Sequence, residues 1–282
     1  MRAVIFGGTG LLGQSLYYHF KEKKYNCFIS SIKKRSHFKS DLLNKFKIKK
    51  FVKKIKPNVI INCAGETNVD LCNNNFSLAY ASNVMTVKNI VECLNELKLN
   101  CLFVQISTDQ VYNSKKLNHE NNINLSNLYG TSKYLSELEA LKFKKTLVIR
   151  TNFFGKSLSL NRMSYSDFIN HNLKKNKTLK VPYNVFFNPV NLNFLSEVIF
   201  KLCKKKILGV YNVGSRNKIS KFAFVKKIIS KLKLDRKYLK GYKSIYLKHQ
   251  RPLNTFMSTD KLRRKLNIKI PLIQDGIKNL KI

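Results

Sequence analysis

Tryptophan is absent from the 282 residues of this chain, and acidic residues are scarce. Without tryptophan, aromatic stacking on a ligand has to use phenylalanine or tyrosine. The five histidines show no H-E-x-x-H or similar spacing, so we expect no metal site. No apolar run approaches the roughly 18 residues that a membrane span requires, and the first residues read as a strand rather than as a signal peptide. We therefore expect no membrane contact.

The cysteines also lack a pattern that would bind zinc or form a redox pair. They lie at positions 27, 63, 72, 93, 101 and 203 and include no C-x-x-C. Most fall in segments predicted to be strands or helices, which indicates buried, reduced thiols. The cysteines and the missing signal peptide together predict a cytoplasmic protein.

The charge of the chain is strongly one-sided. Its 54 lysines and arginines against 15 acidic residues give a net charge of +39. Such an excess can indicate contact with nucleic acid or anionic membranes. Here the lysines lie on nearly every predicted helix and loop, without a zinc-finger spacing, an RNP-like string or a basic tail. We therefore predict no specific nucleic-acid partner, although a positive field helps to collect an anionic ligand.

Short apolar segments alternate with helical ones through the first half of the chain. The predicted strands are 2–6, 27–30, 59–63, 101–107 and 146–150, with helices at 12–23, 76–97 and 134–143 among the segments between them. The second half continues with a strand at 178–181, a helix at 192–204, a strand at 209–213 and a helix that Ser220 starts. This alternation predicts an α/β fold with a Rossmann-type, doubly wound parallel sheet and a smaller C-terminal lobe. Ligands of such sheets bind at the carboxyl ends of the strands.

A glycine-rich turn follows the first strand. Glycines at 7, 10 and 13 allow a tight turn, a close approach of backbone N–H groups to a pyrophosphate, and packing of the next helix. The spacing is G-x-x-G-x-x-G rather than G-x-G-x-x-G, and an ordinary glycine-rich turn is the alternative. The position between strand and helix favours dinucleotide binding.

Tyr129 and Lys133 form the most informative pair of residues. Four positions apart on a helix, they lie on one face, so the ammonium lowers the pKa of the phenol and makes it a proton donor near neutral pH. An exposed Tyr/Lys pair on a solvated helix has the same spacing. The pair lies 21 residues beyond Ser107-Thr108-Asp109 at the end of a predicted strand, which supports a site.

The residues after the second strand bear on the choice of cofactor. An acidic residue about 20 positions beyond the glycine-rich turn favours NAD, whereas a basic residue accommodates the 2′-phosphate of NADP. The chain has no acidic residue there before Asp41. We therefore predict a preference for NADPH that depends on Ser31, Lys33 and Arg35, with NADH as the alternative.

In order and spacing, these motifs resemble the extended short-chain dehydrogenase/reductases, and within them the dTDP-4-dehydrorhamnose reductase group. The residues that carry the resemblance are Gly7 to Gly13, Asp41-Leu42, Ile61 to Gly65, Thr67 to Asp70, Asn83-Val84, Ser107 to Asp109, Tyr129 to Lys133, Glu137, Arg150-Thr151 and Arg251-Pro252.

The resemblance implies NADPH-dependent reduction of the C4 ketone of a nucleotide-linked 4-keto-6-deoxyhexose. Tyr129 would protonate the forming alkoxide, Thr108 would hydrogen-bond the same oxygen, and Lys133 would hold the nicotinamide ribose. Asn83 would support the lysine, unless it is a polar residue on the solvent side.

The same resemblance assigns the binding residues. Together with the three residues named for the 2′-phosphate, the cofactor would contact Gly7, Thr9, Gly10, Leu11, Leu12, Gly13, Asp41, Leu42, Cys63, Ala64, Gly65, Thr67, Asn83, Ser107, Tyr129 and Lys133. The substrate would contact Thr108, Asp109, Asn152, Asn188 and Arg251. Arg251 suits a diphosphate, with a structural cap before Pro252 as the alternative.

The resemblance also divides the chain, into a cofactor domain of residues 1–151 and 186–214 and a substrate lobe of residues 152–185 and 215–282. It leaves a homodimer open. Two departures, Gln110 and the stretch Asn152-Phe153-Phe154, concern the substrate rather than the hydride chemistry. The alternatives are an epimerase or dehydratase of the same superfamily and a non-catalytic NADP-binding regulatory subunit. An acidic pair, usual in the dehydratases, is missing because Gln110 follows Asp109.

Overall fold

The computed structural model describes residues 1–32, 36–39, 41–159, 162–245 and 251–280. The chain divides into two compact units. Unit 1 comprises residues 1–108, 127–150 and 196–211, and unit 2 comprises residues 109–126, 151–195 and 212–282. The predicted cofactor domain and substrate lobe divide the chain differently, because unit 2 also contains residues 109–126, 151, 186–195 and 212–214 of the predicted cofactor domain. The assignment of a ligand to each part stays a prediction.

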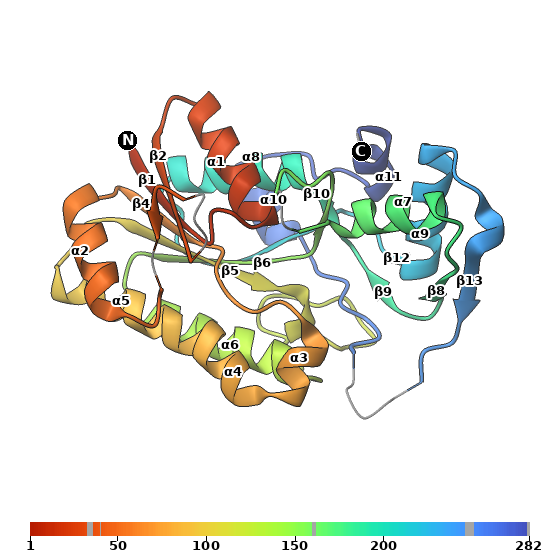
Figure 1. Cartoon of the computed structure of the whole chain (residues 1–282), viewed down its shortest axis with the longest axis horizontal. Coiled ribbons are helices and arrows are strands. Elements are labelled where there is room, and N and C mark those ends of the chain that lie inside the picture. Colours follow the sequence, from red (N-terminus) through yellow and green to blue (C-terminus); the bar gives the residue numbers. More distant parts are fainter. Residues whose placement is uncertain (33–35, 40, 160–161, 246–250, 281–282) are drawn as a thin grey trace. The chain divides into compact units, whose positions relative to one another are not determined.

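A seven-stranded sheet forms the centre of unit 1 (Figure 1), in the order β11-β6-β5-β4-β1-β2-β3. The strands are β1 (Arg2–Phe6), β2 (Asn26–Ser31), β3 (Phe38–Lys39), β4 (Val59–Asn62), β5 (Leu102–Thr108), β6 (Thr146–Thr151) and β11 (Gly209–Val213). Pairs β1–β2, β1–β4, β2–β3 and β4–β5 are parallel. Strands β4 and β5 are buried along their whole length, as expected for a parallel sheet covered on both faces. The predicted Rossmann-type fold is confirmed.

Helices cover both faces of this sheet. They are α1 (Leu11–Glu22), α2 (Lys45–Ile55), α3 (Val69–Asn74), α4 (Phe76–Tyr80), α5 (Thr86–Glu96), α6 (Leu128–Leu141) and α8 (Leu192–Lys204). On one face, α2, α5 and α6 bury a cluster that includes Phe51, Ile90 and Ala140. On the other face, Phe20 of α1 meets Phe200 of α8 edge to face at 5.3 Å between ring centroids. Figure 1 shows the two layers of helices with the sheet between them.

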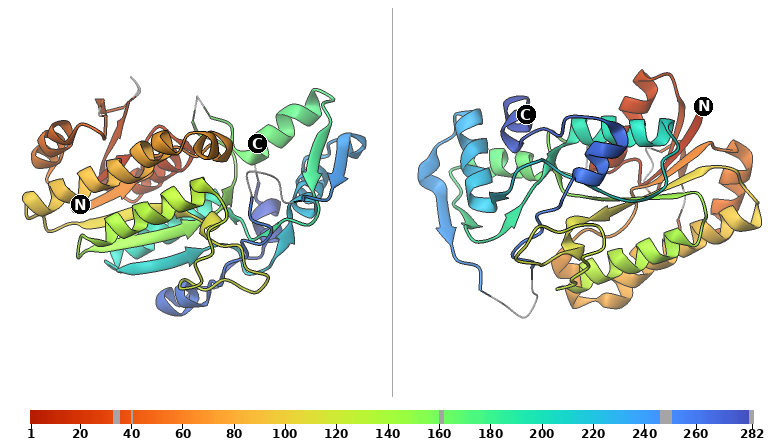
Figure 2. Two further views of the ribbon diagram at one scale, coloured as in Figure 1. Left: turned by 90° about the horizontal axis from the view of Figure 1, so that it is seen from below. Right: turned by 180° about the vertical axis from the view of Figure 1, so that it is seen from behind.

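Among its described residues, unit 2 contains three small two-stranded sheets and four α-helices (Figure 2). The sheets pair β7 (Phe153–Phe154) with β10 (Val190–Asn191), β9 (Phe186–Phe187) with β12 (Ile219–Ser220), and β8 (Leu179–Pro182) with β13 (Leu239–Tyr242). The helices are α7 (Tyr165–Lys174), α9 (Lys221–Leu232), α10 (Asp260–Leu266) and α11 (Ile273–Lys278). Phe154 and Phe187 both pack edge to face on Phe224 in its core.

The predicted elements of the second half are confirmed, and two features of the first half differ from the prediction. The segment 76–97 is not one regular helix, because a π-helical stretch (Ala81–Met85) separates α4 from α5. The two-residue strand β3 was not predicted, since two residues are too few to show a period. Within the described residues, the helices are too short or too polar to cross a bilayer.

Candidate active site

The glycine-rich turn is tightly packed at Gly7 and Gly13, whereas the space beside Gly10 is open. Gly7 has a φ of +70°, and a Cβ atom there would lie 2.6 Å from the Ala64 nitrogen. A Cβ atom at Gly13 would lie 2.4 Å from the Gly7 carbonyl oxygen. At Gly10 the Gly7 oxygen, at 3.2 Å, is the one described atom that a Cβ atom would meet within 4 Å. A side chain at Gly10 would therefore fill open space beside the turn.

The start of α1 is suited to an anion. Gly10 is its N-cap residue, so no side chain caps the helix, and its first turn contains no acidic residue. The N–H groups of a first helical turn have no partner within the helix and carry the positive end of its dipole. A pyrophosphate needs both features, so the turn fits a dinucleotide.

The end of β2 is linked to this turn. The hydroxyl oxygens of Thr9 and Ser31 lie 2.8 Å apart, which joins two of the residues predicted to contact the cofactor. Lys33 and Arg35 lie outside the described residues. Asp41 is exposed and accepts a hydrogen bond from the Leu43 nitrogen, whereas Leu42 is buried in the core below α2 and α5.

The loop after β4 carries four of the predicted cofactor residues. The Cys63 nitrogen donates to the Phe6 carbonyl, and the Ala64 nitrogen donates to the Asn62 side chain at 3.1 Å. Burial raises the pKa of the Cys63 thiol to about 12, so this thiol is neutral and is not a nucleophile. Farther along, the Thr67 nitrogen donates to the Glu66 carboxylate at 2.7 Å.

Asn83 connects this loop to α6. Its carbonyl oxygen accepts from the Glu66 nitrogen at 2.8 Å, and its amide donates to the Ser132 hydroxyl at 2.9 Å. Gly65, with a φ of +144°, lies so close that a Cβ atom there would be 2.4 Å from the Asn83 oxygen. Asn83 is 1% exposed, so the alternative of a solvent-side residue is wrong. The position of Asn83 beside Ser132 supports its expected role next to Lys133.

Three side chains that could assist the reduction of a ketone, by donating a proton or hydrogen bonds, belong to β5 and α6. Thr108 ends β5, while Tyr129 and Lys133 lie in the first two turns of α6, and all three are buried. The Asn127 side chain caps this helix by accepting from the Gly130 nitrogen at 2.7 Å. Tyr129 packs against Val69, Cys72 and Ala79. The Tyr/Lys pair is therefore not an exposed pair on a solvated helix.

The environment of Lys133 lowers its pKa. Its ammonium donates to the Ile106 carbonyl at 2.8 Å. Burial lowers the pKa of Lys133 to about 8, while the Glu137 carboxylate opposes the shift. A lysine in this state is charged at neutral pH and has donors left for a ligand, because an ammonium has three.

A buried ion pair holds these elements together. Arg150 of β6 donates to Glu137 of α6 at 2.5 Å, with side chains 3% and 1% exposed. The Ser107 hydroxyl of β5 donates to the same carboxylate. Ser107, predicted to be near the cofactor, therefore has a partner within the protein that joins β5 to α6.

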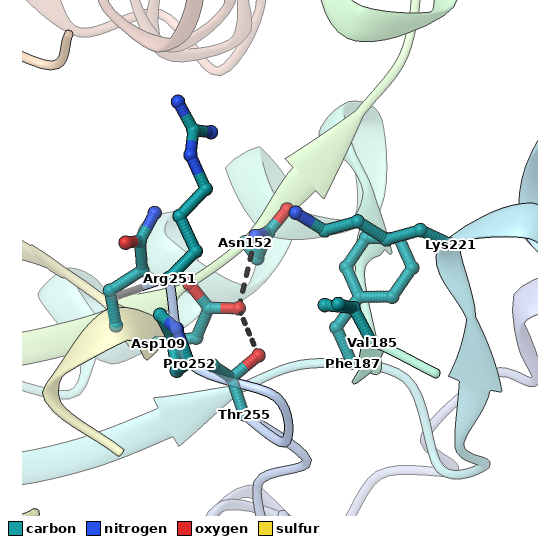
Figure 3. Close-up of a pocket in the computed structure, with 9 residues that line it drawn as sticks. Asp109, Asn152, Val185, Phe187, Lys221, Arg251, Pro252 and Thr255 are labelled. Atoms are coloured by element: carbon teal, nitrogen blue, oxygen red, sulfur yellow. Dashed lines mark hydrogen bonds between the residues drawn. The ribbon is translucent and has the colours of Figure 1, made fainter. Parts of the chain in front are cut away.

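Unit 2 contains a pocket that is open to solvent (Figure 3). Its lining consists of Asp109, Gln110, Asn152, Val185, Phe187, Lys221, Arg251, Pro252 and Thr255. The Asp109 carboxylate accepts from the Asn152 amide at 3.0 Å and from the Thr255 hydroxyl at 2.7 Å. A fixed carboxylate with cations and an apolar wall suits a polar, charged ligand.

Three of the predicted substrate residues, Asp109, Asn152 and Arg251, line this pocket. Asn188 does not line it, because its amide is buried and donates to the carbonyls of Ser215 and Met257. Sequence analysis missed Lys221 and Thr255. Nothing in the sequence distinguished Lys221 from the other basic residues, although its place after the helix-starting Ser220 could have been weighed.

The sequence is similar to a known protein family and to several characterised proteins. The model of a family described as the RmlD substrate binding domain matches residues 1–281. The dTDP-4-dehydrorhamnose reductase of Escherichia coli is 22% identical over 298 residues, 99% of this chain and 97% of the relative. Methionine adenosyltransferase 2 subunit beta of Xenopus laevis is 25% identical over 233 residues, 78% of this chain and 69% of the relative.

A solved structure supports the fold. The crystal structure of dTDP-4-dehydrorhamnose reductase from Bacillus anthracis str. Ames in complex with NADP superposes with a TM-score of 0.89 and 23% identity. The match covers 99% of this chain and 98% of that chain.

Proposed function

The chain belongs to the RmlD substrate binding domain family, and from this premise we propose that it is an NADPH-dependent reductase of the C4 ketone of a nucleotide-linked 4-keto-6-deoxyhexose. The observation that carries the proposal is the buried ammonium of Lys133 on the helix that also presents Tyr129, next to the strand that ends at Thr108. Relatives named dTDP-4-dehydrorhamnose reductase support the same direction.

In the proposed reaction, NADPH, when bound, would supply the hydride that reduces the carbonyl carbon. The Tyr129 hydroxyl gives its proton to the carbonyl oxygen as that carbon–oxygen double bond becomes a single bond. The Thr108 hydroxyl donates a hydrogen bond to the same oxygen, which stabilises its developing charge. The Lys133 ammonium stabilises the phenolate left on Tyr129 and donates to the ribose hydroxyls of the cofactor.

The remaining predicted residues would position the cofactor. The N–H groups of Leu11 and Leu12, at the start of α1, would bind the pyrophosphate. Ser31 would hold the 2′-phosphate with Lys33 and Arg35, which is the reason for proposing NADPH rather than NADH. Asp41 and Leu42 would lie near the adenine, and the loop Cys63 to Gly65 near the nicotinamide half.

The test is NADPH oxidation by the purified protein, offered a panel of nucleotide-linked 4-keto-6-deoxy sugars. We expect turnover on at least one member. Tyr129→Phe removes the general acid and should lower the rate at least about a hundredfold while NADPH affinity is retained. Near-normal turnover in Tyr129→Phe would contradict the assignment of the general acid. The same panel offered with NADH separates the two cofactors.

A regulatory subunit that binds NADP without turnover is the second candidate. The similarity to methionine adenosyltransferase 2 subunit beta is the observation that favours it. NADPH binding with no oxidation on any member of the panel would support this candidate. An epimerase or dehydratase is less favoured, since the neutral Gln110 follows Asp109, and it would carry tightly bound oxidised cofactor after purification.

The proposal includes the assembly and the compartment. Five leucines on three helices are at least 39% exposed: Leu71 of α3, Leu78 of α4, and Leu128, Leu138 and Leu141 of α6. An apolar surface of this kind suits a homodimer. The six cysteines are all unbridged thiols, which suits a reducing compartment such as the cytoplasm.

A further inference from the structure

The pocket of unit 2 has more positive than negative charge. Two cations, Lys221 and Arg251, line it together with one carboxylate, Asp109. That carboxylate is already held by the Asn152 amide and the Thr255 hydroxyl. No hydrogen bond or ion pair joins the Lys221 ammonium to another of the described residues. Lys221 is therefore not explained as the partner that neutralises Asp109.

The main chain fixes the place from which Lys221 extends. Lys221 is the first residue of α9, and its nitrogen donates to the Val185 carbonyl at 2.8 Å. The next residue, Phe186 of β9, holds the segment that carries Arg251 and Pro252, because its nitrogen donates to the Leu253 carbonyl at 2.8 Å. In Figure 3 the Lys221 side chain extends from the start of α9 toward Asn152. These main-chain hydrogen bonds therefore fix the backbone position from which the Lys221 side chain extends.

The surroundings of Lys221 make an uncompensated ammonium costly. Burial lowers the pKa of Lys221, the Asp109 carboxylate opposes this shift, and the Arg251 guanidinium adds to it. A ligand that brings negative charge to the pocket would restore the ordinary preference of the amine for its charged form.

We propose that Lys221 is a specificity-determining residue that donates to an anionic oxygen of the substrate, beside Arg251. The inference deepens the proposed function, on which it rests for the identification of the ligand as a nucleotide sugar. In such a ligand this chemistry belongs to the diphosphate that links sugar and nucleotide, because a 6-deoxyhexose carries no carboxylate. The diphosphate would place anionic oxygens in a pocket that is also apolar along Val185 and Phe187.

The test is calorimetric titration with dTDP, dTDP-glucose and dTDP-glucuronate. Lys221→Met keeps the length of the side chain and removes its charge. If Lys221 binds the diphosphate, this variant should bind all three probes on the order of tenfold or more weakly than the wild type, since a hydrogen bond to a charged group is lost. A weakening confined to dTDP-glucuronate would place Lys221 against the sugar and overturn its assignment to the diphosphate.

Two variants separate binding from folding. Lys221→Arg keeps the charge and should bind the affected probe much more tightly than Lys221→Met. Lys226→Met removes an exposed lysine of the same helix and should bind every probe like the wild type. The affinity of the wild type for the affected probe should fall as the pH rises toward the ordinary lysine range, and this fall should be missing in Lys221→Met.

The inference is overturned if Lys221→Met binds all three probes as the wild type does, or if the wild type binds none of them. Its failure is distinct from that of the proposed function. If the wild type oxidises NADPH and Lys221→Met binds the probes as tightly as the wild type does, only the role of Lys221 is refuted. A wild type that binds dTDP through Lys221 but oxidises no NADPH would refute the reductase alone.

Discussion

At the scale of single residues, Lys133 links the structure most directly to a measurable property. Its pKa is lowered to about 8 by burial, from an ordinary value of 10.5. The ammonium is therefore present below about pH 8 and is lost as the pH rises through that value. A lysine that donates to ribose hydroxyls only when it is charged should pass this titration on to cofactor affinity.

We expect the dissociation constant for NADPH to rise above about pH 8 in the wild type. Lys133→Met should bind NADPH more weakly and without that rise, because it has no group that titrates there. The measurement is fluorescence titration of NADPH across pH. Lys142→Met, which removes a 62% exposed lysine next to the same helix, is the matched control and should keep the wild-type profile. A pH-independent affinity in the wild type would separate Lys133 from the cofactor.

Sequence patterns predicted the secondary-structure positions of candidate site residues where a motif had a fixed spacing. The Tyr129/Lys133 pair and the strand end at Thr108 depend on local spacing, which a sequence states directly. Lys221 and Thr255 were missed, because they reach the pocket through tertiary pairing of β9 with β12 and of Phe186 with residues 253–255. Asn188 matched a family position, yet its partners are two carbonyls that no sequence pattern reveals.

At the scale of elements, the glycine-rich turn offers a clean test, because Gly10 differs from its neighbours. A side chain at Gly10 enters open space, so Gly10→Val should fold. The valine would occupy the space in which a pyrophosphate approaches the start of α1, and NADPH binding should be abolished.

Gly10→Ala serves as a graded control, since its single methyl group would meet the Gly7 oxygen at 3.2 Å. It should retain part of the affinity and a melting temperature near that of Gly10→Val. An NADPH affinity unaltered in Gly10→Val would remove the turn from the cofactor site.

The buried pair of Glu137 and Arg150 joins α6 to β6, and through Ser107 it also joins β5. Removing one partner leaves a buried charge without compensation. Arg150→Met should therefore lower the free energy of unfolding by about 3–5 kcal/mol, measured by urea denaturation.

The double variant Glu137→Gln/Arg150→Met removes both charges and should be more stable than Arg150→Met alone. By contrast, Lys142→Met breaks an exposed pair with Glu139 and should change the free energy of unfolding by less than about 1 kcal/mol. Equal losses in Arg150→Met and Lys142→Met would mean that the buried pair does not hold these elements together.

The elements themselves were largely predictable, because parallel buried strands and amphipathic helices have strong periods. The helix predicted over 76–97 was correct in type but not in regularity, since Ala81–Met85 is π-helical. That stretch includes Asn83, which meets Glu66 and Ser132. A π-bulge depends on such tertiary partners, and its side-chain period is too close to that of an α-helix to be read from one sequence.

At the scale of the whole molecule, the net charge of +39 affects association more than folding. Lysines cover the surface, while the few acidic residues are used in local pairs such as Glu92 and Glu96 with Lys45. A positive surface attracts a nucleotide sugar at long range without specifying it, and salt screens that attraction within about 10 Å. Specificity must then come from the side chains that line the binding sites.

The apolar surface on α3, α4 and α6 leads to a prediction about assembly. Leu138 and Leu141 are 44% and 43% exposed on one face of α6, and a monomer would leave both in water. We expect a concentration-dependent dimer in sedimentation equilibrium, and Leu138→Glu should weaken it at least about tenfold by placing a charge in an apolar contact. Leu208→Glu changes a leucine of similar exposure before β11 and should leave the dimer intact. A wild type that stays monomeric at every concentration, or equal losses in the two variants, would rule out this surface as the dimer interface.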